Sequence, residues 1–353
     1  MNLSDRLKTI RSIPEKIEML EEYLKTEEIP DSSRIRAIDR FARLSAQMGN
    51  LRRADELVRE GISLAKASED NSILMRLYQV ESAIACNLSD HSRGEKSASL
   101  SIELARQSKE PDYRVLPLIE RGINRTQLSK FEEAIEDFDE AMEVAEHRKK
   151  EAWKLRVLTN LAATYGSMQQ FRREAETISS ALMLAEATGN QFAMGTLLVN
   201  LGNNRIQARD FDEAELKFKD AQQFAEESGN RRVLAIALTG IGDVMQHKGF
   251  FFDAEMKFQD ALEIYKKLGD PLGMIQVRSK LNALKLDSPT RMAELDKLIN
   301  EAEELDNKRL LVALLDQKVE IAKYIDDWEL TYEILLRRQE IEREIWDRRT
   351  KEV

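Results

Sequence analysis

Four stretches of this chain can be written one above another so that their residue types agree: KFEEAIEDFDEAMEVAE (130–146), QFRREAETISSALMLAE (170–186), DFDEAELKFKDAQQFAE (210–226) and FFFDAEMKFQDALEIYK (250–266). Each stretch begins 40 residues after the one before it. Inside each stretch the apolar residues are three or four positions apart, which is the spacing of an amphipathic helix. Three columns of residues keep this register: Phe131, Phe171, Phe211 and Phe251; Phe138, Phe218 and Phe258; Ala145, Ala185 and Ala225.

The other half of each 40-residue cycle carries a column of small residues. An apolar residue stands four positions before each of them, which again predicts a helix. Glycine inside a helix costs about 1 kcal/mol relative to alanine, so its recurrence indicates a close approach of two helices. A larger side chain is not expected to fit there. The column consists of Ala42, Ser82, Gly122, Ala162, Gly202 and Gly242.

Two sets of breaks separate the predicted helices. Gly189-Asn190, Gly229-Asn230 and Gly269-Asp270 recur every 40 residues and are typical of left-handed C-terminal caps. The other turn falls at Gly49-Asn50, Arg209-Asp210 and Gly249. Each cycle is therefore predicted to contain helix, tight turn, helix and tight turn.

Composition excludes several classes of function. Hydrophobic residues make up 42% and charged residues 33% of the 353 residues, a globular and helix-favouring balance. The formal net charge of -10 argues against a nucleic-acid partner. One cysteine and three scattered histidines offer neither a disulfide framework nor a metal site, and no phosphate loop or catalytic motif is present. We expect no enzyme activity, no cofactor, no membrane span and a cytoplasmic location.

Leu201-Gly202, followed by the Phe-x-x-Ala-x-x-x-Phe pattern of the second half, resembles the tetratricopeptide repeat. The best match is LLVNLGNNRIQARDFDEAELKFKDAQQFA, from Leu197 to Ala225, and the resemblance extends over about residues 34–340. The period here is 40 residues, longer than the commoner form of this repeat. The resemblance implies an all-α, right-handed superhelical solenoid of about eight antiparallel helix pairs, with the first helix of each pair lining the concave side.

We divide the chain into an N-terminal helical cap (1–33), a solenoid (34–327) and a charged C-terminal helix (328–353). Leu298, Ala302 and Leu305 are expected to continue the register, and Trp328 to resume it after a cycle shortened by three residues. The last helix is either a polar cap or a stalk leading to a further domain or a homodimer contact.

Residues 88–117 depart from the pattern, with Ser92, Arg93 and Gly94 in place of core and helix-forming residues. Pro117 either delays or kinks its helix. The segment is a candidate hinge, or it reflects ordinary drift in a tolerant repeat.

By the same resemblance, a set of polar residues on the first helices should face the concave groove. Amide and hydroxyl groups can bind an extended peptide backbone, and the N-terminal arginines could meet an acidic or phosphorylated segment. The competing interpretation is a solvated helix face. The candidate residues are Arg36, Arg43, Arg76, Asn87, Gln127, Asn203, Gln207, Asp243, Gln246 and His247.

The function expected from these features is a non-catalytic scaffold that binds a protein or peptide on its concave face. The alternative is an N-terminal sensory or regulatory input domain of a bacterial signalling protein, which relays binding through its C-terminal helix. A scaffold should work as a free-standing module, whereas an input domain needs an attached output.

Overall fold

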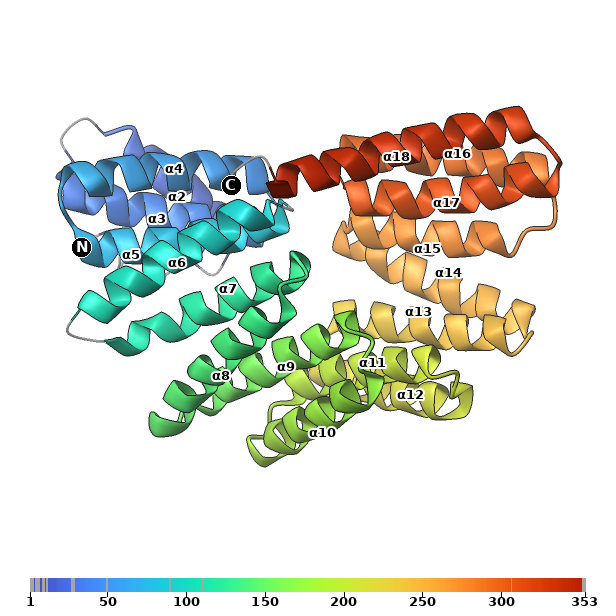
Figure 1. Ribbon diagram of the computed structural model, residues 1–353, viewed down its shortest axis with the longest axis horizontal. Coiled ribbons are helices and arrows are strands. Elements are labelled where there is room, and N and C mark those ends of the chain that lie inside the picture. Colours follow the sequence, from blue (N-terminus) through green and yellow to red (C-terminus); the bar gives the residue numbers. More distant parts are fainter. Residues whose placement is uncertain are drawn as a thin grey trace. The chain divides into compact units, whose positions relative to one another are not determined.

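The computed structural model describes residues 3, 7, 10, 12–26, 29–48, 50–88, 90–108, 111–305 and 307–350 (Figure 1). For Pro111 and residues 346–350 only the backbone is described. All regular structure in these residues is helical, in agreement with the predicted all-α class. None of the described helices is both long and apolar enough to cross a lipid bilayer.

Helix α2 (Ile13–Leu24) precedes a regular alternation of first and second helices. The first helices are α3 (Asp31–Gln47), α5 (Asn71–Asn87), α7 (Val115–Gln127), α9 (Glu151–Ser167), α11 (Gln191–Gln207), α13 (Arg231–His247), α15 (Pro271–Ala283) and α17 (Lys308–Tyr324). The second helices are α4 (Leu51–Ala67), α6 (His91–Gln107), α8 (Phe131–His147), α10 (Phe171–Ala187), α12 (Phe211–Ser228), α14 (Phe251–Leu268), α16 (Ser288–Glu304) and α18 (Trp328–Thr350).

The predicted turns are confirmed where they are described. Gly189, Gly229 and Gly269 have φ values of 63°, 70° and 62°, in the left-handed region. The following Asn190, Asn230 and Asp270 each accept a hydrogen bond from a backbone N–H in the first turn of the next helix. Gly49 lies outside the described residues. Each junction therefore ends one helix and caps the next within three residues.

The chain divides into two compact units, here called unit 1 (Met1–Thr164 together with Arg348–Val353) and unit 2 (Tyr165–Asp347). In both, consecutive helices pack side by side, and the first helices also contact one another: α3 with α5 and α5 with α7 in unit 1, and α11 with α13 in unit 2. First helices thus form an inner layer within each unit.

The small-residue column lies at the seam between the two helices of a pair, as predicted. A Cβ atom added to Gly122 would lie 2.7 Å from the ring of Phe138, and one added to Gly242 would lie 2.5 Å from Phe258. Where the column holds alanine, at Ala42, the corresponding second-helix residue is the smaller Val58. Small residues on the first helix are therefore matched to large ones on the second.

The shortened cycle lies earlier than the sequence suggested. Helix α15 ends at Ala283 and is four residues shorter than most first helices, while the turn before Ser288 is one residue longer, so the net loss of three residues falls at the end of α15. Leu295, fully buried, takes the place of Phe258, and Leu305 falls after the end of α16 with 41% of its surface exposed. The prediction that Leu305 continues the buried register was wrong. Phe251 likewise departs from its column, being 59% exposed.

Pro117 delays its helix rather than kinking it. A short 3-10 turn, η1 (Pro111–Arg114), precedes α7, which begins at Val115 and has 13 residues where most other helices have 17. Residues 109 and 110 lie outside the described residues. The segment 88–117 lies within unit 1, whereas the boundary between the units falls inside α9. A hinge at 88–117 stays a prediction.

Candidate functional site

The candidate site is the inner face of the first helices, defined here by the residues whose side chains connect one first helix to the next. In unit 1 the connections run from Arg76 to Asp39 and from Arg156 to Glu120. In unit 2 Lys280 reaches back to Asp243 in the same way. The side chains that make these connections are Asp39, Arg76, Glu120, Arg156, Asp243 and Lys280, and the inner face is taken to include Arg36 and Arg43 next to Asp39 on α3 and the predicted Asn203, Gln207 and Gln246 on α11 and α13.

In unit 1, Asp39 brings two of the predicted arginines together. Its carboxylate is buried and accepts hydrogen bonds from Arg43 Nε at 3.0 Å and from Arg76 Nη2 at 2.8 Å. Arg36 lies three residues earlier on the same helix and is exposed. Two predicted residues, Arg43 and Arg76, therefore meet at one buried carboxylate.

A second buried carboxylate, Glu120 of α7, pairs with Arg156 of α9. Burial raises the pKa of Glu120 above its ordinary value, although the charges of Arg156 and Arg43 favour the ionised form. Sequence reasoning missed Glu120 and Arg156. The signal was the spacing of about one repeat between opposite charges on successive first helices.

In unit 2 the inner face is dominated by amides around one ion pair. Asp243 accepts a hydrogen bond from Lys280 Nζ at 2.6 Å, and burial raises the pKa of Asp243 despite this cation. Asn203 occupies on α11 the position that Asp243 occupies on α13, and it is exposed. Gln207 is exposed and Gln246 half-buried at the ends of the same helices.

Three predicted residues are placed differently. The His247 ring stacks on Phe211 of α12, with 5.0 Å between the ring centroids, and so packs against a second helix. Asn87 donates a hydrogen bond from Nδ2 to the carbonyl oxygen of Ala83 in its own helix at 2.9 Å. Gln127 is the half-buried last residue of α7. The charge of His247 nevertheless acts to lower the pKa of Asp243, so this histidine stands near the ion pair of unit 2.

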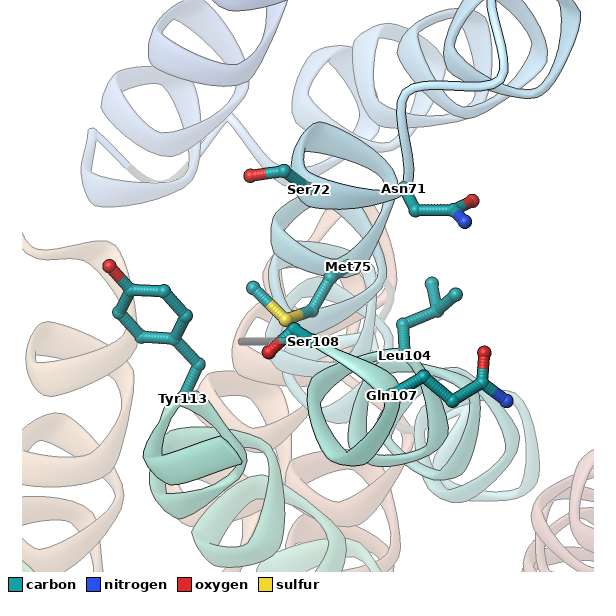
Figure 2. A pocket seen from close by; sticks show the side chains of 7 residues that line it. All are labelled: Asn71, Ser72, Met75, Leu104, Gln107, Ser108 and Tyr113. Carbon is teal, nitrogen blue, oxygen red and sulfur yellow. The ribbon is translucent and has the colours of Figure 1, made fainter. Parts of the chain in front are cut away.

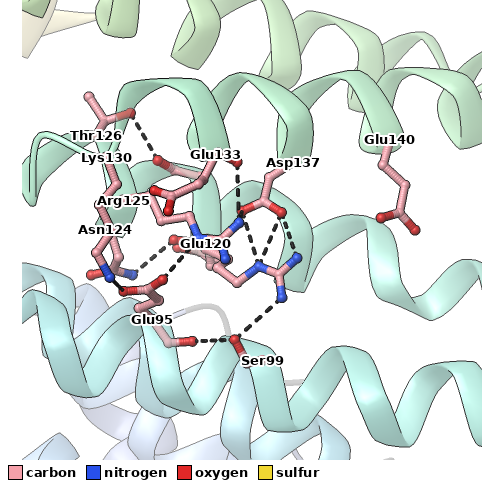
Figure 3. Close-up of polar contacts among 12 residues, drawn as sticks. Glu95, Ser99, Glu120, Asn124, Arg125, Thr126, Lys130, Glu133, Asp137 and Glu140 are labelled. Atoms are coloured by element: carbon pink, nitrogen blue, oxygen red, sulfur yellow. Dashed lines mark hydrogen bonds and ion pairs between the residues drawn. The ribbon is translucent and has the colours of Figure 1, made fainter. Parts of the chain in front are cut away.

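A buried charge network supports the inner layer of unit 1 from behind (Figure 3). Asp137 of α8 accepts hydrogen bonds from Arg121 Nη2 at 2.6 Å and from Arg125 Nη1 at 2.9 Å, both on α7. Arg125 Nε also donates to Glu95 of α6 at 2.9 Å, and Lys130 Nζ donates to the same carboxylate at 2.8 Å. The network ties α6, α7 and α8 together, and it was not predicted, because Asp137 looks like part of a solvated acidic face.

Two pockets lie away from the inner face. One, of about 270 Å³, is formed at the start of α5, the end of α6 and η1, with Tyr113 opposite Asn71 and Leu104 (Figure 2). It is lined by Asn71, Ser72, Met75, Leu104, Gln107, Ser108 and Tyr113. The other, of about 390 Å³, lies among α14, α15 and α16, where α15 ends four residues short of the usual length.

No protein-family model matches the sequence, and comparison with curated proteins finds no match. Solved structures do resemble the chain. A Rap protein complexed with competence and sporulation factor is 13% identical, covers 98% of each chain and has a TM-score of 0.69. The Rap conjugation gene regulator of plasmid pLS20, in complex with the Phr* peptide, is 14% identical over 98% of this chain and 94% of that one, with a TM-score of 0.65.

Aspartyl phosphate phosphatase F from Bacillus subtilis is similar as well, at 15% identity over 96% of this chain and 90% of that one, with a TM-score of 0.65. At these identities the likeness is one of fold. Together with the repeating helix pairs it confirms the expected architecture. The chain is an all-α solenoid of the tetratricopeptide-repeat type.

Proposed function

We propose that this chain is a non-catalytic peptide-binding regulator that takes an extended peptide on the inner face of unit 2. The observation that carries the proposal is the row of amides on α11 and α13, where Asn203, Gln207 and Gln246 lie beside the Asp243–Lys280 ion pair. An amide both donates and accepts, so it can bind a peptide backbone without demanding one side chain. Two solved structures of the same fold hold a named factor or peptide, which supports this class of ligand.

The Asp243–Lys280 ion pair fixes the position of the helices that carry the amides. Lys280 and Asp243 join α15 to α13, so the two helices hold their spacing while a ligand binds. A rigid platform loses little conformational entropy on binding, which favours a short peptide that has to be ordered itself. The exposed amides supply hydrogen bonds, and the ion pair supplies an orienting charge pattern.

The test uses a library of random heptapeptides and three forms of the full chain. The wild type is compared with an Asn203→Ala/Gln207→Ala/Gln246→Ala variant and with a control, Gln223→Ala/Gln259→Ala, which removes exposed amides from the second helices α12 and α14. We expect wild type and control to select the same peptides and the triple variant to lose them. Selection of the same peptides by all three forms would place binding elsewhere.

The non-catalytic part of the proposal has its own test, because one similar structure is named an aspartyl phosphate phosphatase. Acetyl phosphate, a small acyl phosphate, should be hydrolysed at the same rate with and without the chain. A faster rate that scales with protein concentration would overturn this part. A cytoplasmic location stays a prediction.

The alternative function, an input domain that relays through its last helix, is favoured by the outer side of α18. Leu335 stands at the position that Phe258 holds in α14, yet it is 41% exposed where Phe258 is fully buried. Trp328 and Tyr332 are 64% and 65% exposed on the same helix. This side is suited to a homodimer or an output-domain contact. Light scattering of the wild type against Tyr332→Glu/Leu335→Glu tests self-association, and equal monomeric masses would exclude the homodimer.

A further inference from the structure

The inner face of unit 1 carries the opposite charge to the chain as a whole. The chain has a formal net charge of -10. On the inner face of unit 1, by contrast, four arginines stand against two carboxylates, namely Arg36, Arg43, Arg76 and Arg156 against Asp39 and Glu120. We propose that this face binds the carboxylates of an acidic peptide segment. The inference rests on the proposed function, since it names the chemistry of a peptide that the first helices bind.

Asp39 holds two guanidinium groups in place for such a ligand. A guanidinium has five N–H donors in a rigid plane, and Asp39 takes one from Arg43 and one from Arg76 in the contacts described above. The two arginine side chains remain 39% and 54% exposed. Their outer edges can therefore meet a second carboxylate. Because the buried Asp39 already fixes their orientation, little side-chain entropy is lost when that carboxylate binds.

Glu120 and Arg156 repeat the arrangement two first helices further along. The Arg156 side chain is 41% exposed although it is paired with a buried carboxylate. Unit 1 thus offers two sites of the same design, each with a buried acid behind an exposed guanidinium. An extended peptide with several acidic residues can engage both, whereas a single small anion engages one.

The geometry favours an acidic peptide over other polyanions. Nucleic acids and anionic membranes present wide charged surfaces, and their approach would bring phosphates against the acidic remainder of the chain. The arginines of unit 1 lie instead on the inner layer, between carboxylates that leave only part of each guanidinium exposed. A planar carboxylate on a narrow peptide chain matches the exposed N–H donors of such a guanidinium, here called the guanidinium fork.

The probe is fluorescein-labelled hexaglutamate, with hexaglutamine as the uncharged comparison, and binding to the full chain is followed by fluorescence anisotropy. We expect hexaglutamate to bind in low salt, to weaken as salt rises, and hexaglutamine not to bind. Arg36→Gln/Arg76→Gln should weaken the affinity at least about tenfold, since charge-assisted hydrogen bonds are lost. The control Arg59→Gln/Arg172→Gln removes the same charge from exposed side chains of second helices and should change affinity little.

The following outcomes decide whether unit 1 binds the carboxylates of an acidic peptide. Equal weakening by the two double variants, or no binding of hexaglutamate, overturns the proposal. Binding of a hexaphosphoserine peptide or of phosphatidylserine vesicles without binding of hexaglutamate overturns the choice of carboxylate. Arg76→Lys keeps the charge and disturbs folding least, so a loss of affinity with this variant, at unchanged circular dichroism, supports recognition by the fork. If hexaglutamate fails while the amide triple variant still loses its library peptides, peptide binding stands and only this inference falls.

Discussion

The match between Gly242 and Phe258 leads to a prediction that can be worked out from the structure. A Cβ atom at position 242 would lie 2.5 Å from Phe258 Cε1 and 2.7 Å from Cδ1, where ordinary contacts begin at 3.4 Å. The ring would have to move by about 1 Å in a filled seam, and such overpacking costs about 1–3 kcal/mol. Alanine gains about 1 kcal/mol in helix propensity. We expect Gly242→Ala to destabilise this helix pair by up to about 2 kcal/mol.

Phe258→Val should rescue Gly242→Ala in part, because the pair would then resemble Ala42 and Val58. Alone, Phe258→Val leaves a cavity and should cost about 2–3 kcal/mol, less than a Phe→Ala change. In the double variant the new methyl group occupies part of that cavity. We therefore expect the double variant to be about 1–2 kcal/mol more stable than the sum of the single effects.

Native-state hydrogen exchange of the α13 and α14 amides is the appropriate assay, because repeat arrays open locally and a global unfolding free energy averages over them. The control is Gly195→Ala, where the nearest atom, Val233 Cγ1, would be 3.2 Å away and the helix-propensity gain offsets the strain. Additive effects, within about 0.5 kcal/mol, would refute the argument that the two residues are matched in size.

Arg125→Ala should destabilise α6–α8 by about 3 kcal/mol, because Asp137 and Glu95 lose a buried partner. Hydrogen exchange of the α7 amides at increasing urea concentration measures this loss of stability. A change below about 1 kcal/mol would contradict the prediction. Burial acts to raise the pKa of Glu95, but hydrogen bonds from Lys130 and Arg125 hold it below the ordinary 4.5. The stability that Glu95 contributes should therefore be present above that pH and lost as the pH falls below it, so wild type and Glu95→Gln should differ in urea midpoint at pH 7 and converge in acid. Arg209 has a φ of 60°, which costs a residue with a side chain about 1 kcal/mol, so Arg209→Gly should raise the protection of the flanking amides, and lower protection would count against it.

Much of the fold could be predicted from the sequence because each 40-residue cycle repeats the same packing problem. The glycines of the small-residue column and the Gly-Asn turns recur, and recurrence makes a weak local signal strong. Leu305 was misplaced because the net loss of three residues at the end of α15 leaves apolar residues of α16 at helical spacing in either register. Such a shift is visible only when burial shows which residue, here Leu295, fills the seam.

The candidate site could be predicted only in outline. Position within the repeat predicts that Arg43 and Arg76 lie on one face, since helical geometry fixes which residues point the same way, and both bond to Asp39. It could not show that Asp39 joins them, because a bond between residues 37 positions apart depends on how closely two first helices approach. The charge network around Asp137 was not predicted for a similar reason. Burial of a charge depends on its partners, and Arg121 and Arg125 come from another helix.

The size matching at the seam also restricts how a gene of this kind can be shortened or lengthened by recombination. Removing residues 71–150, with both breaks after second helices, would keep every pair intact. Removing residues 51–130, a segment of the same length, would join α3 to α8 and set Ala42 against Phe138. The present partner of Phe138 is Gly122, and a Cβ atom at that position would already lie 2.7 Å from the Phe138 ring. Unequal crossing-over should therefore be tolerated at one kind of turn and selected against at the other. Both deletions keep the reading frame, but only the first keeps the size matching between the two helices of each pair.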